Sequence, residues 1–241
     1  MNQLTIGVLG GMGTYATIHF FEQYAHVFNA EKEWERPRII IDNRCTMPSR
    51  VRAFLYGERR EQLVEEMIES IENLVKSGAT KVVLACNTSH LFIPEIMTRI
   101  PQYIDSIVNI IEVCAKKVID DQIKEVFLIG SEGTIESRIY QNILESQGIR
   151  CVVPQKEQYT NLRKCIESVK QNEYSDEIRE IFLSLINEHT ACILGCTELP
   201  ILYEKYSAGV NCEYIYDPLF LVLNQLKEEF INEKNINIRS I

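Results

Sequence analysis

Short apolar runs alternate with longer amphipathic stretches along most of this chain. The apolar runs have the length and the β-branched content of buried strands, and they occupy residues 4–9, 38–42, 81–85, 125–129, 150–153 and 191–195. The stretches between them predict helices, as in residues 59–76, where apolar side chains recur at helical spacing. Strands that alternate with helices are typical of an α/β protein with parallel sheets.

The pattern repeats in the second half of the chain. The turn Gly10-Gly11-Met12-Gly13-Thr14 follows the first strand, and Gly130-Ser131-Glu132-Gly133-Thr134 follows the strand at residues 125–129. Both turns place glycine, two residues, glycine and threonine before an expected helix. Further along each half, an apolar strand ends at a cysteine, Cys86 in the first half and Cys196 in the second. The repetition indicates two structurally equivalent halves.

We therefore predict an α/β fold with two similar parallel-sheet domains, Rossmann-like or flavodoxin-like, that face each other across a cleft. The first domain comprises residues 1–113 and carries Cys86. The second comprises residues 114–213 and carries Cys196, and a C-terminal helix in residues 214–233 packs back on the first domain. Ligands of open parallel sheets bind beyond the carboxyl ends of the strands. The two cysteines are thus expected on opposite walls of one cleft.

Composition and charge narrow the class of protein. The formal net charge of −9 argues against nucleic acid and anionic membranes as general partners. No apolar stretch approaches the roughly 20 residues of a membrane span, and residues 1–5 lack a signal-peptide pattern. The 8 cysteines are scattered, which favours free thiols in a reducing compartment over a disulfide framework. We expect a cytoplasmic protein that acts on a small molecule.

Two other kinds of site are disfavoured by spacing. Gly10-x-x-Gly13 lacks the full dinucleotide-binding spacing and the phosphate-binding lysine, so its backbone N–H groups are better candidates for holding a carboxylate. Cys192 and Cys196 are four residues apart on an expected strand. That spacing separates them by about 13 Å along the chain, which is poor geometry for a shared metal ion. We expect no metal site.

The two strand-end cysteines offer two kinds of chemistry. Each precedes an expected helix, whose amino terminus favours a thiolate. Cys86 with His90, four residues on, would suit an acyl-transfer nucleophile, but this alternative leaves Cys196 without a task. Two thiols on opposite faces of a planar carbanion could instead remove a proton from one face and donate one to the other. Such a pair would invert a stereocentre.

The sequence Leu84-Ala85-Cys86-Asn87-Thr88-Ser89-His90 and the sequence Ile193-Leu194-Gly195-Cys196-Thr197-Glu198-Leu199 resemble the two signature motifs of the aspartate/glutamate racemase superfamily. The Gly-Gly-Met-Gly turn with Ala16-Thr17 resembles its aspartate racemase branch, which includes broad-specificity amino-acid racemases. Glutamate racemases usually have a histidine where Glu198 stands. The resemblance covers nearly the whole chain. It implies cofactor-independent racemisation of aspartate first and glutamate second, without pyridoxal phosphate, by a homodimer.

The resemblance also implies roles for individual residues. Cys86 and Cys196 would be the two catalytic bases. The substrate's α-amino and α-carboxylate groups are expected to bind Asn87, Thr88 and Thr197. Its side-chain carboxylate is expected to bind Arg50 and Lys170. The further pocket residues are Met12, Thr134 and Glu198. His90 and Glu198 are candidates for tuning the thiols or the substrate's amino group. A guanidinium can hold a carboxylate with two hydrogen bonds, and a lysine adds a point charge.

Some residues depart from the family pattern, and other functions stay open. Thr14 and Tyr15 replace the usual proline, Ser49 replaces an acidic residue, and Glu132 stands where small residues are common. These departures bear on substrate size and preference. The alternatives are a related reaction (hydantoin racemisation, maleate isomerisation or decarboxylation of a malonate) and a non-catalytic amino-acid-binding protein. A decarboxylase needs only one cysteine.

Overall fold

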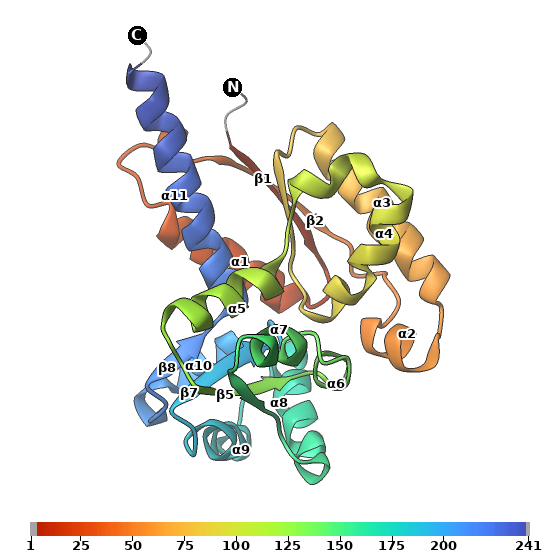
Figure 1. Ribbon diagram of the computed structural model, residues 1–241, viewed down its shortest axis with the longest axis vertical. Coiled ribbons are helices and arrows are strands. Elements are labelled where there is room, and N and C mark those ends of the chain that lie inside the picture. The colour runs from red at the N-terminus through yellow and green to blue at the C-terminus, as the bar shows by residue number, and fades with distance from the viewer. Residues whose placement is uncertain (1–3, 240–241) are drawn as a thin grey trace.

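The described residues form two four-stranded parallel sheets, one in each half of the chain (Figure 1). The computed structural model describes residues 4–239, with side chains described through residue 234. The first sheet has the order β2-β1-β3-β4 and the second β6-β5-β7-β8. In both, the first strand of the half lies between the second and third, as in flavodoxin-like folds. The α/β fold with two similar halves is confirmed.

The strands are short; the central strands β1, β3, β5 and β7 are almost wholly buried, and the outer strands are only partly buried. Their bounds are β1 Thr5–Gly10, β2 Arg38–Asn43, β3 Lys81–Leu84, β4 Ile107–Val108, β5 Glu125–Gly130, β6 Arg150–Val152, β7 Ala191–Gly195 and β8 Tyr214–Tyr216. Every strand pair is parallel, with Ile6 opposite Ile39 in the first sheet and Val126 opposite Cys151 in the second. Helices cover both faces of such sheets, which explains why the strands read as continuous apolar runs.

The helices follow the amphipathic stretches. Their bounds are α1 Thr14–Val27, α2 Arg50–Tyr56, α3 Arg60–Lys76, α4 Ile93–Arg99, α5 Ile110–Asp120, α6 Glu132–Glu136, α7 Gln141–Ser146, α8 Tyr159–Gln171, α9 Asp176–Ile186, α10 Leu199–Tyr206 and α11 Pro218–Arg239. The Ser49 and Ser131 side chains accept backbone N–H bonds at the starts of α2 and α6. Such N-caps satisfy otherwise unpaired donors.

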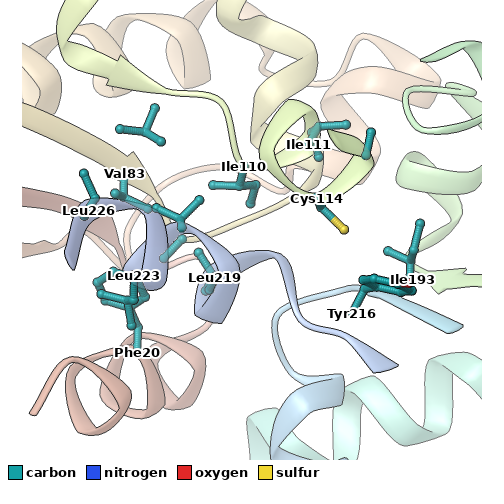
Figure 2. Packing of buried hydrophobic residues seen from close by; sticks show 14 of the residues in the cluster. Phe20, Val83, Ile110, Ile111, Cys114, Ile193, Tyr216, Leu219, Leu223 and Leu226 are labelled. Carbon is teal, nitrogen blue, oxygen red and sulfur yellow. The ribbon is translucent and has the colours of Figure 1, made fainter. Parts of the chain in front are cut away.

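One hydrophobic core cluster runs through both halves. It contains Phe20 of α1 and Cys114 of α5, Ile193 and Tyr216 of the second sheet, and the inner face of α11 (Figure 2). Each sheet has one further cluster on its outer side, under α3 in the first half and under α8 and α9 in the second. Because the cluster that runs through both halves is continuous, each half buries apolar surface against the other. The two halves therefore pack directly against each other and need no linker.

The C-terminal part of the chain corrects one prediction. Residues 214–216 form strand β8 beside Ala191–Ile193 of β7, so the expected helix at residues 214–233 starts only at Pro218, and it extends to Arg239. A three-residue strand is too short to show a periodic pattern. The Asp217 carboxylate accepts the backbone N–H groups of Leu219 and Phe220, which fixes the start of α11.

Helix α11 lies against α1 and α5 (Figure 1). Helix α5 starts at Ile110, so the predicted boundary between residues 113 and 114 falls within it. The division into residues 1–113 and 114–213 stays a prediction. Within the part of the chain that the structure describes, no helix is long and apolar enough to cross a membrane.

Candidate active site

A small cavity lies between the two halves, beyond the carboxyl ends of β3 and β7. Its volume is about 70 Å³, and we call it the inner cavity. Residues from both halves line it, including both strand-end cysteines and most of the predicted substrate-binding residues: Met12, Arg50, Cys86, Asn87, Thr88, Lys170, Cys196, Thr197 and Glu198. The structure thus brings nine of the ten predicted site residues to one cavity. The tenth, Thr134, lies behind Thr88 and bonds to its hydroxyl (3.0 Å).

Cys86 is held by a tight turn directly after β3. The Ala85 N–H still donates to Leu9 in the adjacent strand (2.9 Å), and a 3₁₀ turn, Thr88–Phe92, follows. The Cys86 carbonyl accepts bonds from the Ser89 hydroxyl (2.6 Å) and from His90 Nδ1 (2.9 Å). These bonds fix the backbone at the strand end, where Cys86 lines the inner cavity.

His90 serves this turn and does not act on the Cys86 thiol. Its Nδ1 bonds to the Cys86 carbonyl, and its Nε2 accepts the Ile110 N–H (3.3 Å). Both ring nitrogens are therefore used by the backbone, and the ring is neutral with the proton on Nδ1. Burial lowers the His90 pKa to about 4. A Cys–His acyl-transfer pair is not formed.

The buried neutral ring predicts a pH dependence of stability. Because the pKa of His90 is about 4 in the folded protein and 6.5 for a free imidazole, the unfolded chain binds the extra proton first. The contribution of neutral His90 to the free energy of unfolding should be fully present above about pH 6.5, and the free energy of unfolding should fall by about 3 kcal/mol as the pH drops to 4. Urea unfolding across this range measures it. His90→Gln should flatten this part of the profile, and parallel profiles for the two proteins would contradict the assignment.

Cys196 is paired with a carboxylate. Its Sγ donates to Glu198 Oε2 (2.9 Å). Burial raises the pKa of Cys196 well above its ordinary value, and the Glu198 charge and hydrogen bond raise it further, while Lys170 opposes them. Burial likewise raises the pKa of Glu198, against the opposing effects of the Cys196 bond, Lys170 and Arg50. Glu198 Oε1 is buried and has no hydrogen-bond partner among the described residues.

Each glycine turn packs against a residue that follows the cysteine of the opposite half. A Cβ on Gly13 would overlap Glu198 Oε1, and a Cβ on Gly133 would lie 2.9 Å from the Thr88 methyl group. Thr88 and Glu198 are each two residues beyond a cysteine, so the contacts are equivalent in the two halves. The N–H of Gly11 already donates to Thr17 Oγ1 (3.0 Å). These glycines therefore allow close packing of the two halves.

Polar side chains complete the inner cavity. Asn87 Oδ1 accepts a hydrogen bond from the Tyr140 hydroxyl (2.6 Å), while Asn87 Nδ2 is buried and has no partner in the part of the chain that the structure describes. The Thr88 hydroxyl bonds to Ser131 (2.8 Å), and the Thr197 hydroxyl donates across the halves to the Ala85 carbonyl (3.2 Å). The Asn87 amide therefore has a free N–H donor for a ligand.

Two cations reach the same cavity. Arg50 starts α2 and donates to the carbonyls of Met12 (2.7 Å) and Pro48 (3.0 Å), and its buried Nε has no partner within residues 4–234. Lys170, near the end of α8, donates to Glu167 (2.8 Å). Burial opposes the charge of Lys170, but Glu167, Glu198 and Cys196 outweigh it and raise the lysine pKa. Both cations balance the buried Glu198.

Some residues at the site were not predicted. Ser131 lies in the repeated turn, so the match between Gly10–Thr14 and Gly130–Thr134 held a signal for it. Val51 and Ile166 also line the inner cavity, and Tyr140 supports Asn87 from behind; no motif marks any of them. Among the described residues, no group of three or more His, Cys, Asp or Glu side chains could hold a metal ion.

Comparisons with known proteins agree with this arrangement. A family model described as Asp/Glu/Hydantoin racemase matches residues 9–223. The broad specificity amino-acid racemase RacX of Bacillus subtilis (strain 168) is 25% identical over 216 residues, which cover 85% of this chain and 90% of RacX. The structure of Picrophilus torridus aspartate racemase is similar with a TM-score of 0.80 and 26% identity, covering 93% of this chain and 94% of that one.

Glutamate racemase from Thermus thermophilus shares the fold at a TM-score of 0.64 and 18% identity, over 97% of this chain and 82% of that one. The family model spans most of the chain, including both cysteine motifs and both glycine turns. The sequence resemblance is thereby confirmed. The chain belongs to the Asp/Glu/Hydantoin racemase family and is an amino-acid racemase.

Proposed function

We propose that this racemase interconverts L- and D-aspartate, with glutamate as a second substrate, by two-base proton transfer at Cα. The observation that carries the proposal is the placement of Cys86 and Cys196 on one small cavity, from equivalent strand ends of the two halves. A substrate Cα between two such thiols presents one face to each. The chemistry then requires only that one face loses a proton and the other gains one.

In the proposed reaction, the thiolate of one cysteine takes the Cα proton, and the electron pair of the C–H bond delocalises into the α-carboxylate. The thiol of the other cysteine then donates its proton to the opposite face of Cα. One C–H bond breaks and one forms, so the product is the mirror image of the substrate. General acid and base groups of this kind contribute about 10²- to 10⁴-fold to a rate.

The other groups of the inner cavity suit an acidic amino acid. The free Asn87 Nδ2 and the Thr88 hydroxyl are donors for the α-carboxylate. The Thr197 hydroxyl donates its proton to the Ala85 carbonyl, so towards the substrate it can only accept a hydrogen bond. The unpaired Glu198 Oε1 is an acceptor for the α-ammonium group. Arg50 Nε and Lys170 supply charge for the side-chain carboxylate. Each carboxylate of the substrate thus has a donor or a cation as its partner, and the α-ammonium group has an acceptor.

The test is proton exchange in D₂O. Incubation with L-aspartate should introduce deuterium at Cα, which ¹H NMR detects, and should form D-aspartate, which chiral chromatography detects. Pure protein that gives neither product from aspartate or glutamate would reject the proposed substrates. Binding without exchange, seen by calorimetry, would favour an amino-acid-binding protein instead. A homodimer, implied by the resemblance, and a cytoplasmic location, expected from the cysteine usage and composition, stay predictions.

The Tyr140 hydroxyl should matter for substrate binding although it does not line the inner cavity. Its bond to Asn87 Oδ1 (2.6 Å) turns the amide so that Nδ2 is left free. Tyr140→Phe should raise KM for aspartate about tenfold, since one such bond contributes about 1 kcal/mol and a buried unpaired acceptor costs more. Asn87→Ala should have a similar effect.

The control is the double variant Tyr140→Phe/Asn87→Ala. If Tyr140 acts through Asn87, the second change adds nothing to the first, because both remove the same positioned donor. Effects that multiply would show that Tyr140 acts independently, as a structural residue alone.

A further inference from the structure

A second, larger cavity adjoins the inner cavity. Its volume is about 430 Å³, and we call it the outer cavity. The two cavities share the lining residues Ser49, Val51, Ser131, Ile166 and Lys170, so they adjoin there, and we call this shared region the passage. Helix α2 of the first half packs against α6 of the second next to this passage (Figure 1). The outer cavity therefore adjoins the inner cavity and is lined by residues of both halves.

The sizes of the cavities indicate what each can hold. Sites for small organic ligands typically have about 300 to 1,000 Å³, which includes the outer cavity and excludes the inner one. The inner cavity has room for the reacting carbon and the groups attached to it. A substrate with its Cα between Cys86 and Cys196 must then direct its side chain through the passage.

The walls of the outer cavity suit an uncharged side chain. Apolar surface comes from Val51 and Leu55 of the first half and from Leu162 and Ile166 of the second. Side chains of this kind gain about fourfold in binding for each methylene group that they bury against such walls.

The charged residues on this cavity are already paired with one another or with neighbours. Arg163 pairs with Glu132, Lys170 with Glu167 (2.8 Å), and Arg52 with Glu58 (2.7 Å). Because each of these charges is already neutralised by its partner, an anionic side chain gains little there, whereas an uncharged side chain leaves the pairs undisturbed. The charge pattern favours apolar occupants beyond Lys170.

We propose that the outer cavity is a side-chain subsite and that it extends the substrate range to uncharged amino acids with long apolar side chains, such as methionine and leucine. The inference rests on the proposed position of Cα between the two cysteines. Aspartate ends at Lys170 in the passage, and a longer apolar side chain continues along Leu55 and Leu162. Ser49 and Glu132, which depart from the family pattern, both line this subsite.

The test compares substrates and one cavity-filling variant. The wild-type protein should exchange the Cα proton of L-methionine and L-leucine in D₂O as well as that of L-aspartate. Leu55 is a half-buried residue of α2 that lines the outer cavity and not the inner one. The variant Leu55→Trp therefore fills the outer cavity without touching the inner cavity. It should lower kcat/KM for methionine at least tenfold, because about three buried side-chain groups are displaced. Aspartate should change by less than about threefold.

Leu221→Trp is the matched control. Leu221 is a half-buried leucine on α11 that lines neither cavity, so this variant should leave both substrates unchanged. Equal losses for aspartate and methionine in Leu55→Trp would show that the outer cavity is only an entrance, which overturns the inference.

The wild-type comparison does not depend on the folding of any variant. Exchange of aspartate without exchange of methionine or leucine overturns the inference and leaves the proposed function intact. Exchange of methionine and leucine without aspartate or glutamate supports the subsite and rejects the proposed acidic substrates. No exchange with any of these amino acids rejects both.

Discussion

Replacing either Cys86 or Cys196 by serine is expected to lower the rate of aspartate racemisation by about 10³-fold or more. The two thiols line one cavity from opposite halves, and inversion needs a base on one face of Cα and an acid on the other. A serine hydroxyl fits the same space but ionises far less readily than a thiol, so it supplies no base near neutral pH. Chiral chromatography of the product measures the loss.

The two single variants should differ in the exchange that they retain. With one thiol left, the protein can still remove the Cα proton from the enantiomer that presents it to that thiol, and it returns deuterium to the same face. Cys86→Ser and Cys196→Ser should therefore each deuterate one enantiomer of aspartate, opposite in the two variants, without inverting it. ¹H NMR in D₂O distinguishes this from a complete loss of function.

Cys45→Ser is the control, because Cys45 is exposed and lies outside the inner cavity. It should racemise aspartate at the wild-type rate. The double variant Cys86→Ser/Cys196→Ser should exchange neither enantiomer. A single cysteine variant that still inverts aspartate at a near wild-type rate would contradict the two-base mechanism.

The repeated pattern of the sequence carried most of what could be predicted. Each strand that ends in a cysteine is a local feature, and parallel strands end at one edge of a sheet, so Cys86 and Cys196 could be placed at sheet edges from the sequence. Their placement on one cavity followed from the likeness of the two halves. The resemblance supplied Arg50 and Lys170, since nothing in the charge pattern distinguishes them from surface cations.

What could not be predicted depends on contacts between distant segments. Strand β8 has three residues and is specified by its pairing with β7. Tyr140 lies 53 residues from its partner Asn87 and is one aromatic residue among many in the sequence. His90 looked like a candidate partner for the Cys86 thiol, but the Ile110 N–H occupies its second nitrogen. Spacing along the chain does not report such three-dimensional contacts.

Glu198→Gln should move the pH–rate profile to lower pH and raise KM for aspartate about 10- to 100-fold. The Glu198 carboxylate helps to raise the pKa of the Cys196 thiol, and a neutral amide removes that charge, so the pKa of Cys196 falls. Where Cys196 must be a thiolate, activity then begins at lower pH. In the reverse direction, where Cys196 must be a thiol, activity is also lost at lower pH.

The rise in KM has a separate cause. Glu198 Oε1 is buried, no described residue bonds to it, and it is the acceptor proposed for the substrate's α-ammonium group. A hydrogen bond to a charged group contributes about 1.5 to 3 kcal/mol, which corresponds to the expected change in KM. Kinetics of both enantiomers from pH 5 to 10 would measure both effects.

Glu177→Gln is the matched control, since Glu177 pairs with Lys164 on the surface of α9 and should leave the profile unchanged. A shift of the Glu198→Gln profile to higher pH would mean that the carboxylate favours the thiolate, which contradicts the electrostatic argument. An unchanged KM with a shifted profile would limit Glu198 to tuning Cys196, and the α-ammonium group would then need another acceptor. The two readouts thus separate the influence of Glu198 on the thiol from its contact with the substrate.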